Sequence, residues 1–414
     1  MSASTPLSYD KAVEVVLQHA ATYQPVGTER VPLLHSTGRV LASPVRADRD
    51  LPPFPRSTRD GFAVRSQDCK PGATLAIIGE IRAGAALEST PRAINPGECI
   101  EIMTGASVPA TADAVLMYEH AQRNGASIVP DRTIVAGDNI VPAGAEARSG
   151  QEILPRGTRL NHAAIAVSAS VGWASHEVFR RPRVIILPTG DELVDLNAAP
   201  GHHQIRNSNS YSLASQITEA GAEPMLLPVA PDDKTRLRDL IGEGLQGDLL
   251  LLTGGVSVGK YDYVEEVLSE FDARFHFTGV MLQPGKPLVF GDAQHKGRRV
   301  PFFGLPGNPV STMVTFELFA RPVINALSGT KPRAPKFLQA PLASAVRVKT
   351  GLTRFLPGRL LSDGFATAVE FAKWHGSGDV VSAATSDCFI VVPPDAQDMA
   401  AGKMVSVFVP GAGL

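Results

Sequence analysis

The sequence has little cysteine, almost no net charge and no long apolar run. Its three cysteines are odd in number and far apart among 414 residues, which argues against a disulfide framework or a zinc knuckle and favours the cytoplasm. The 39 Lys and Arg residues nearly balance 41 Asp and Glu residues, so no broad attraction for nucleic acid is expected. No apolar run has the length of a membrane span, and the first residues lack the pattern of a signal peptide. We therefore expect a cytoplasmic protein that binds neither nucleic acid nor membranes.

The chain changes character several times along its length. Helical patterning near the N-terminus, with Ser8 as an N-cap, returns over residues 161–172. Short apolar strands with Gly and Pro turns lie between these stretches, and they predict a β-rich insert. Alternating strands and helices then predict a parallel, doubly wound α/β sheet, and a final run of short strands predicts a small β-barrel or sandwich. The expected domains are a discontinuous N-terminal domain (1–45 and 146–176), a β-rich insert (46–145), an α/β domain (177–329) and a C-terminal β-barrel domain (330–414).

The most informative stretch reads DLLLLTGGVSVGK, from Asp248 to Lys260. Its four leucines are apolar on both faces, as in a central strand of a covered parallel sheet. Thr253, Gly254 and Gly255 end the run, and helical spacing resumes over 261–271. Glycines permit close approach of the backbone to a ligand, and free N–H groups near a helix start favour an anion. The alternative is a tight strand-to-helix turn that binds nothing.

The same stretch partly matches the P-loop of nucleoside triphosphatases. Gly254, Gly259 and Lys260 have the required spacing, but Tyr261 stands where a Ser or Thr should bind Mg²⁺. Triphosphate hydrolysis is therefore not the favoured interpretation.

Several polar loops follow predicted strands of the α/β domain and should converge, since parallel strands share one carboxyl edge. In GLPGNPVST, Asn308 suits an N-cap and Pro309 the first helical turn, which makes an anion site. Lys286, between Gly285 and Pro287, suits a phosphate or another oxyanion. The loops expected to meet are 189–192, 253–260, 284–287 and 306–309.

Carboxylates also accumulate in these loops. Asp191, Glu192, Asp232 and Asp262 could hold a hard cation such as Mg²⁺, which usually acts together with substrate phosphates. Each of them alone is more often a solvated or helix-capping residue. Their joint placement with the glycine turns and Lys286 favours chemistry at a phosphate.

Two polar positions stand out before the α/β domain. Asp60 precedes Gly61 after a proline-rich extended segment, and the pair is typical of a turn on a rigid loop. Thr104 and Gly105 end a predicted strand of the β-rich insert. A purely structural role for Asp60 as a turn residue is the plain alternative.

These motifs, taken together, resemble the molybdopterin molybdenumtransferases of molybdenum cofactor biosynthesis, the gephyrin E-domain-like family. TGDEL, TGGVSVGKYDY, PGKP and LPGNPVS occur in the family's order, as do the upstream DLPPFPRSTRDGFAV and MTGASVP and the downstream GSGDVVSAA. The resemblance covers nearly the whole chain. It implies insertion of molybdate into adenylylated molybdopterin with Mg²⁺-dependent release of AMP. It also implies a four-domain homodimer, with a molybdopterin-binding α/β domain at its centre, that contacts the molybdopterin adenylyltransferase.

The resemblance also implies site residues. Asp60, Glu192, Asp262 and Lys286 match catalytic positions, and Glu192 and Asp262 match metal ligands. Asp60 and Thr104 match positions that act on the partner subunit's site. The implied substrate-binding residues are Thr104, Thr189, Gly190, Asp191, Asp232, Thr253, Gly254, Gly255, Ser257, Gly259, Pro306, Gly307, Asn308 and Ser377.

The sequence departs from the family pattern at several of its motifs. Arg59 replaces a Met beside Asp60, and Gly144-Ala145-Glu146 retains only one carboxylate of an acidic pair. Gln283 replaces a Lys, and Leu352 stands where a Gly-Arg pair is common. Two basic anion contacts are thus missing or moved, and Arg354 or Arg359 are the residues that could compensate.

Two other functions remain open at this stage. One is the preceding adenylyl transfer from ATP, which relatives of the α/β domain perform. The other is a scaffold that keeps the fold and binds a partner, as the related gephyrin does. Retention of Asp60, Glu192, Asp262 and Lys286 favours catalysis, and AMP release from adenylylated molybdopterin would separate the three.

Overall fold

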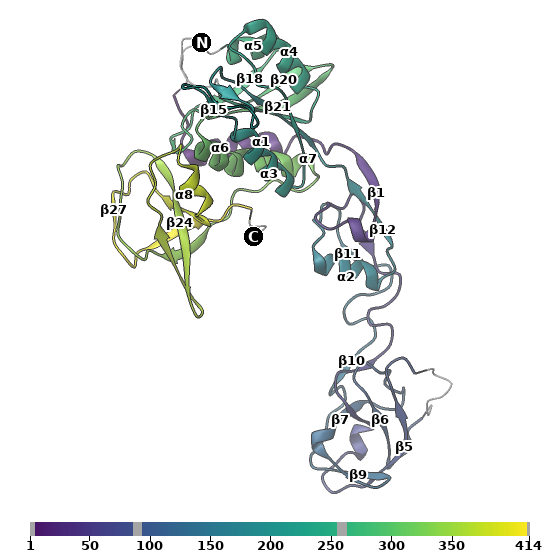
Figure 1. Ribbon diagram of the computed structural model, residues 1–414. Coiled ribbons are helices and arrows are strands. Elements are labelled where there is room, and N and C mark those ends of the chain that lie inside the picture. Colours follow the sequence, from purple (N-terminus) through teal and green to yellow (C-terminus); the bar gives the residue numbers. More distant parts are fainter. Residues whose placement is uncertain (1–4, 86–92, 255–262, 412–414) are drawn as a thin grey trace. The chain divides into compact units, whose positions relative to one another are not determined.

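The computed structural model describes residues 5–85, 93–254 and 263–411 (Figure 1). The chain divides into two compact units. The first contains residues 1–42, 157–161 and 176–414, and the second contains 43–156 and 162–175. Each unit is considered by itself below.

A six-stranded sheet, counted over the described residues, forms the centre of the first unit. Its order is β16 (Glu223–Leu226), β13 (Arg183–Pro188), β17 (Leu249–Thr253), β21 (Arg298–Leu305), β20 (Val289–His295) and β18 (Arg274–Thr278). The first four strands are parallel, but β20 is antiparallel to both neighbours. The expectation of a wholly parallel sheet was therefore wrong. Only a tight turn with positive φ at Lys296 and Gly297 joins β20 to β21, and such a turn is too short for the crossover that a parallel pair needs.

Helices cover both faces of this sheet, as the leucine run predicted. Leu249 and Leu251 point into one core, and Leu250 and Leu252 point into the other. The doubly wound α/β arrangement is thus confirmed for the parallel strands. The first core packs against α1 (Tyr9–Ala20), α3 (Asn209–Glu219), α6 (Pro309–Thr315), the π-helical turn η5 (Phe316–Ala320) and α7 (Arg321–Leu327), and the second against α4 (Lys234–Gly244) and α5 (Val264–Glu270).

The C-terminal part of the first unit is a second sheet. Its strands are β19 (Leu282–Gln283), β24 (Thr353–Asp363), β26 (Cys388–Val392), β28 (Met404–Phe408) and β22 (Leu338–Pro341), with β25 (Ala366–Phe371) paired to β24. Helix α8 (Val380–Ala384) precedes β26. Phe355, Phe389 and Phe408 join the core beneath α1 and α6, which attaches this sheet to the α/β layers.

The remaining strands of the first unit form three short pairs. They are β1 (Thr28–Pro32) with β12 (Ser175–Phe179), β14 (Leu193–Val194) with β15 (Ile205–Arg206), and β23 (Val346–Arg347) with β27 (Asp398–Met399).

The second unit consists mostly of β-strands. Its largest sheet has the order β7 (Ala114–Met117), β4 (Gly61–Val64), β6 (Glu98–Ile102), β5 (Leu75–Ile81), β9 (Ser127–Pro130) and β8 (Ala121–Asn124). Its other described elements are two strand pairs, the helix α2 (His162–Ser170) and the 3-10 helices η2 (Ser66–Asp68) and η4 (Tyr118–His120). The pairs are β3 (Arg56–Ser57) with β10 (Ile140–Val141), and β2 (Val45–Arg46) with β11 (Glu152–Leu154). Over the described ranges, none of the helices combines the length and the apolar character needed to cross a membrane.

Candidate functional site

Three strand ends meet at one edge of the α/β sheet. The register pairs Pro188 with Thr253, and Thr253 with Leu305, so the loops after β13, β17 and β21 begin side by side. The Thr189 amide donates to the Thr253 carbonyl at 3.0 Å. Gly254 has φ of 90°, and a Cβ there would lie 2.5 Å from the Thr189 carbonyl oxygen. Only glycine therefore permits this close approach, which brings Thr189 and Gly190 beside Thr253 and Gly254.

Asn209, which the sequence analysis did not single out, connects two of these loops. Its Nδ2 donates to Thr253 Oγ1 at 3.1 Å and to the Gly307 carbonyl at 2.7 Å. Its Oδ1, and the Oγ1 of Thr189, are buried and have no hydrogen-bond partner among the described residues. Buried polar atoms of this kind can accept hydrogen bonds from a bound ligand. The sequence could have indicated this role of Asn209, because Asn209 lies in the first turn of a helix that starts at the same sheet edge.

Asn308 occupies the N-cap position of α6, and Pro309 is the first residue of the helix, as predicted. The side chain of Asn308 does not cap the helix, however, which corrects the prediction for its role. It donates instead to Ser377 Oγ at 2.9 Å, while the Val310 amide donates to the Ser377 carbonyl at 3.0 Å. Ser377, from the C-terminal part of the unit, is thereby brought to the loop that contains Pro306 and Gly307.

Three of the predicted carboxylates lie close to one another. The Asp232 amide donates to Asp191 Oδ1 at 3.2 Å. Burial, followed by the charges of Asp191 and Glu192, raises the pKa of Asp232. The Glu192 carboxylate folds back over Gly190, where a Cβ would lie 2.4 Å from Glu192 Oε2. None of the three forms an ion pair within the described part of the chain. An uncompensated group of carboxylates is a suitable donor set for a hard divalent cation.

Lys286 reaches the same sheet edge by a route that the sequence analysis did not foresee. The loop 284–287 does not follow a strand of the α/β sheet, because β19 pairs with β24 of the C-terminal sheet. It precedes the antiparallel strand β20, whose first residue pairs with Gly304 at the end of β21. Lys286 is exposed, and Gly285 has φ of 122° with Thr315 too close to admit a Cβ. The reason given for the convergence of this loop was therefore wrong, and the convergence of Lys286 with the other site residues stays a prediction.

The departure at Gln283 can be placed in the structure. Gln283 is exposed and pairs in register with Arg354, whose Nε donates to the Lys349 carbonyl at 3.0 Å. Arg359 donates to the Thr385 carbonyl at 3.0 Å. Of the two arginines considered as compensation, Arg354 is therefore the strand neighbour of Gln283.

Asp60 and Thr104 come together in the second unit. Asp60 Oδ1 accepts from the Thr104 amide at 2.6 Å and from the Thr104 hydroxyl at 2.8 Å. These bonds, the backbone one first, lower the pKa of Asp60 and keep it ionised. Gly61 is the first residue of β4 and not a turn glycine, and a Cβ there would lie 2.0 Å from the Leu116 carbonyl oxygen. In the same unit, Glu146, the carboxylate left from the acidic pair, binds Arg56 at 2.8 Å.

The remaining predictions fall outside the described residues. They are Gly255, Ser257, Gly259, Lys260 and Asp262, together with the P-loop comparison over the same stretch.

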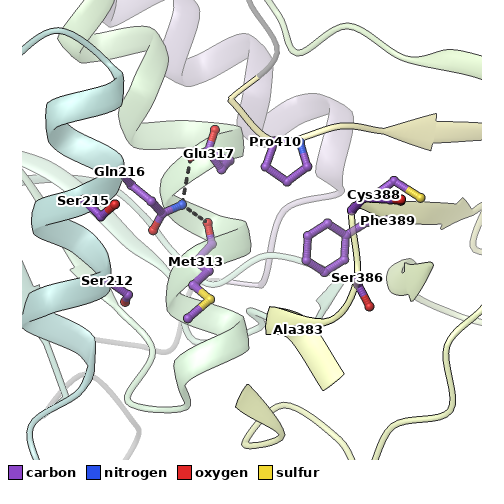
Figure 2. Close-up of a pocket in the computed structure, with 11 residues that line it drawn as sticks. Ser212, Ser215, Gln216, Met313, Glu317, Ala383, Ser386, Cys388, Phe389 and Pro410 are labelled. Atoms are coloured by element: carbon purple, nitrogen blue, oxygen red, sulfur yellow. Dashed lines mark hydrogen bonds between the residues drawn. The ribbon is translucent and has the colours of Figure 1, made fainter. Parts of the chain in front are cut away.

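A cavity of about 390 Å³ lies further along the helices that start at this edge (Figure 2). Ser212 and Gln216 of α3 face Met313 of α6, and Phe389 of β26 closes the other side. Gln216 Nε2 donates to the Met313 carbonyl at 3.1 Å and to Glu317 Oε1 at 2.8 Å. None of the predicted site residues lines this cavity, so it is separate from the group of residues at the sheet edge.

Three family profiles match the chain in succession. They are the MoeA N-terminal region (domain I and II) over residues 7–172, a "Probable molybdopterin binding domain" over 185–326, and the MoeA C-terminal region (domain IV) over 339–409. The middle match contains the candidate site at the sheet edge, and the third contains Ser377.

Characterised relatives and solved structures match along nearly the full length. The molybdopterin molybdenumtransferase of Nostoc sp. is 34% identical over 92% of this chain and 88% of its own. The protein of the same name from Bacillus subtilis is 34% identical over 98% and 94%. A crystal structure of the molybdopterin biosynthesis moeA protein from Pyrococcus horikoshii OT3 superposes with a TM-score of 0.79 at 26% identity, covering 98% of this chain and 100% of that one.

Proposed function

Because the chain belongs to the molybdopterin molybdenumtransferase family, we propose that it inserts molybdate into adenylylated molybdopterin with release of AMP. One observation carries this proposal. Glycine turns, a pair of unsatisfied polar atoms and Ser377 gather at one sheet edge beside three carboxylates without ion partners in the described residues. Phosphate esters and oxyanions are the ligands that such a group of backbone amides and hydroxyls accepts.

The residues divide into two groups by the part of the substrate that each suits. Thr189, Asn209 and Thr253 form a neutral polar patch. Its acceptor, the Asn209 Oδ1, has no partner within the described ranges and suits the amino groups of a pterin or a purine. Asn308 and Ser377 offer a hydroxyl and an amide to an oxyanion, and Lys286 provides positive charge at the same edge. This division leaves the carboxylates for a cation.

A magnesium ion fits the donor set of Asp191, Glu192 and Asp232, since Mg²⁺ prefers carboxylate oxygens and substrate phosphates. When bound, the ion would neutralise negative charge on the link between the pterin phosphate and AMP. Glu192 is the described residue that we assign as its ligand. The second assigned ligand, Asp262, lies outside the described residues.

We further propose that the active protein is a homodimer whose site is shared between subunits. Asp60 and Thr104 form a pre-organised pair in the second unit, while the sheet-edge residues belong to the first unit. In the dimer, the Asp60 and Thr104 of one subunit would complete the site of the other. Contact with the molybdopterin adenylyltransferase and a cytoplasmic location remain predictions from the sequence.

The four-domain division and the C-terminal barrel also remain proposals. A bridge from Leu342 to Val369 links the residue after β22 to β25, which supports closure of the C-terminal sheet.

The test is a single incubation of the purified chain with adenylylated molybdopterin, molybdate and Mg²⁺. We expect AMP to be released only when molybdate and Mg²⁺ are both present. Asn209→Ala should lower the rate, because Thr253 and the Gly307 carbonyl lose their common donor, whereas Thr218→Ala on the same helix should not. If the protein releases no AMP but consumes ATP when molybdopterin is supplied, adenylyl transfer would replace molybdate insertion as its function. Partner binding without either reaction would indicate a scaffold.

A further inference from the structure

A second group of metal-binding side chains lies on another part of the first unit. His19 is in the last turn of α1, His276 is on β18, and Asp292 is on β20. One donor atom from each residue lies within 4.8 Å of the other two. None of these residues takes part in the site proposed for molybdate insertion.

The contacts within this group fix its geometry. The two imidazole rings stack with their centroids 3.6 Å apart, and His276 Nε2 lies 2.9 Å from Asp292 Oδ2. Arg299 binds the other carboxylate oxygen and also pairs with Asp272 Oδ2 at 2.6 Å. Asp292 Oδ2 is thereby directed toward the histidines. Arg299 thus orients the carboxylate as an outer-shell partner orients a metal ligand.

A β-bulge in β18 determines the direction of His276. Phe275 pairs with Gly291 and Phe277 pairs with Phe290, so His276 is an extra residue opposite a continuous partner strand. A bulge of this kind redirects a side chain, and bulges occur often at functional positions. The edge strand β18 therefore presents His276 toward the end of α1, where it meets His19.

Two further observations favour a cation here. His19 is at the C-terminal end of α1, where the helix dipole favours positive charge. The hydroxyl of Tyr23, near the charge of Asp292, is buried and has no hydrogen-bond partner among the described residues.

We propose that His19, His276 and Asp292 bind one divalent transition-metal ion, with zinc as the ion of choice. Two imidazoles and one carboxylate suit Zn²⁺ far better than Mg²⁺, which prefers oxygen ligands alone. The ion replaces the proton shared between His276 and Asp292 and fastens the end of α1 to the edge strand β18 and its neighbour β20. Its role is structural, and it is separate from the magnesium proposed at the sheet edge.

Zinc binding to the full-length chain tests this proposal. The protein is freed of metal with a chelator and titrated with Zn²⁺ while Mg²⁺ is in excess to occupy carboxylate sites. We expect one zinc ion per chain and a higher thermal midpoint with zinc. The control is the double variant H202A/H203A, which removes an exposed histidine pair elsewhere and should keep both properties.

His19→Ala and His276→Gln should each lower the zinc affinity by more than about 100-fold, since loss of an outer-shell partner alone lowers it about 10–100-fold. The Gln side chain can still donate to Asp292, so the second variant preserves the local hydrogen bond. Zinc binding by either variant that equals the wild type would overturn the proposal.

Cobalt provides a readout that does not depend on how well the variants fold. Co²⁺ bound to the wild-type chain should give the intense visible bands of four- or five-coordinate cobalt with nitrogen ligands. The pale spectrum of six-coordinate cobalt, or the absence of a zinc-dependent rise in the thermal midpoint, would show that these residues form only a stacked and ion-paired contact.

Discussion

Among single residues, those at the sheet edge combine features that stability alone does not explain. Asn209 makes two hydrogen bonds with its amide nitrogen, and its buried oxygen has no partner in the described part of the chain. Thr189 likewise leaves its hydroxyl oxygen unpaired, although it is only 5% exposed. Unsatisfied buried atoms reduce stability, so these two atoms support the ligand site proposed at this edge.

Asp232→Asn should stabilise the folded protein at neutral pH but slow its reaction. The folded pKa of Asp232 is raised above its ordinary value of 3.8, so the folded state holds its proton more tightly than the unfolded chain. The free energy of unfolding therefore falls as the pH rises from 3.8 through the folded pKa of Asp232, and this loss of stability persists at neutral pH. The variant should raise the thermal midpoint at pH 7, have no effect in acid, and slow AMP release.

The control for this prediction is Asp239→Asn, an equal charge change on the exposed surface of α4. It should alter neither property. Added Mg²⁺ should stabilise the wild type more than Asp232→Asn, because the ion relieves the repulsion among the carboxylates. An equal response of both proteins to Mg²⁺ would remove Asp232 from the proposed cation site.

Gln283→Lys tests the departure from the family pattern. The new ammonium group would stand on β19 opposite Arg354 and add a second cation for an oxyanion. Exposed charge pairs contribute about 0.2–1 kcal/mol, so molybdate should bind up to about fivefold more tightly in equilibrium dialysis. Gln397→Lys, with the same change on an exposed loop, should leave binding unchanged. Equal affinities for Gln283→Lys and the wild type would place position 283 away from the anion.

Among the elements, the close approach of the ends of β13 and β17 depends on Gly254, which follows β17 and packs against Thr189 after β13. Gly254→Ala should destabilise the protein by about 1–3 kcal/mol in urea unfolding, because a Cβ would collide with the Thr189 carbonyl at a positive φ. Gly242→Ala in α4 is the matched control. Its Cβ would meet only the Phe271 ring at 3.5 Å, so it should stabilise the helix by about 0.5–1 kcal/mol. Similar effects of the two changes would mean that the turn can relax.

Much of this arrangement was predictable because local sequence patterns determine it. The leucines of β17 alternate between two cores, so a run that is apolar on both faces predicted a covered central strand. The reversal of β20 was not predicted, since Lys296-Gly297 was not recognised as a hairpin turn. The side-chain role of Asn308 was not predictable either. Asn308 donates through Nδ2 to Ser377, and this contact links residues 69 positions apart, which a local sequence pattern does not indicate.

For the protein as an assembly, the decisive question is whether one site needs two chains. Asp60→Ala and Glu192→Ala remove residues from different units of the same chain, so each variant alone should be inactive. If the site is shared across a two-fold axis, a mixed dimer regains one intact site from the Glu192 of one chain and the Asp60 of the other. Random exchange of subunits should then restore about a quarter of the wild-type rate of AMP release.

The same experiment has a distinct outcome if each chain forms its own site. Every site in the mixture would then lack either Asp60 or Glu192, and mixing would restore nothing. Subunit exchange must be verified by mixing two differently tagged chains and recovering both tags together, and sedimentation should give a dimer at micromolar concentration. Recovery of both tags without recovery of activity would disprove the shared site while leaving the dimer intact, because exchange would have occurred without assembling a complete set of residues. Recovered activity would instead show that the Asp60–Thr104 pair and the carboxylates of the sheet edge act on one substrate from two subunits.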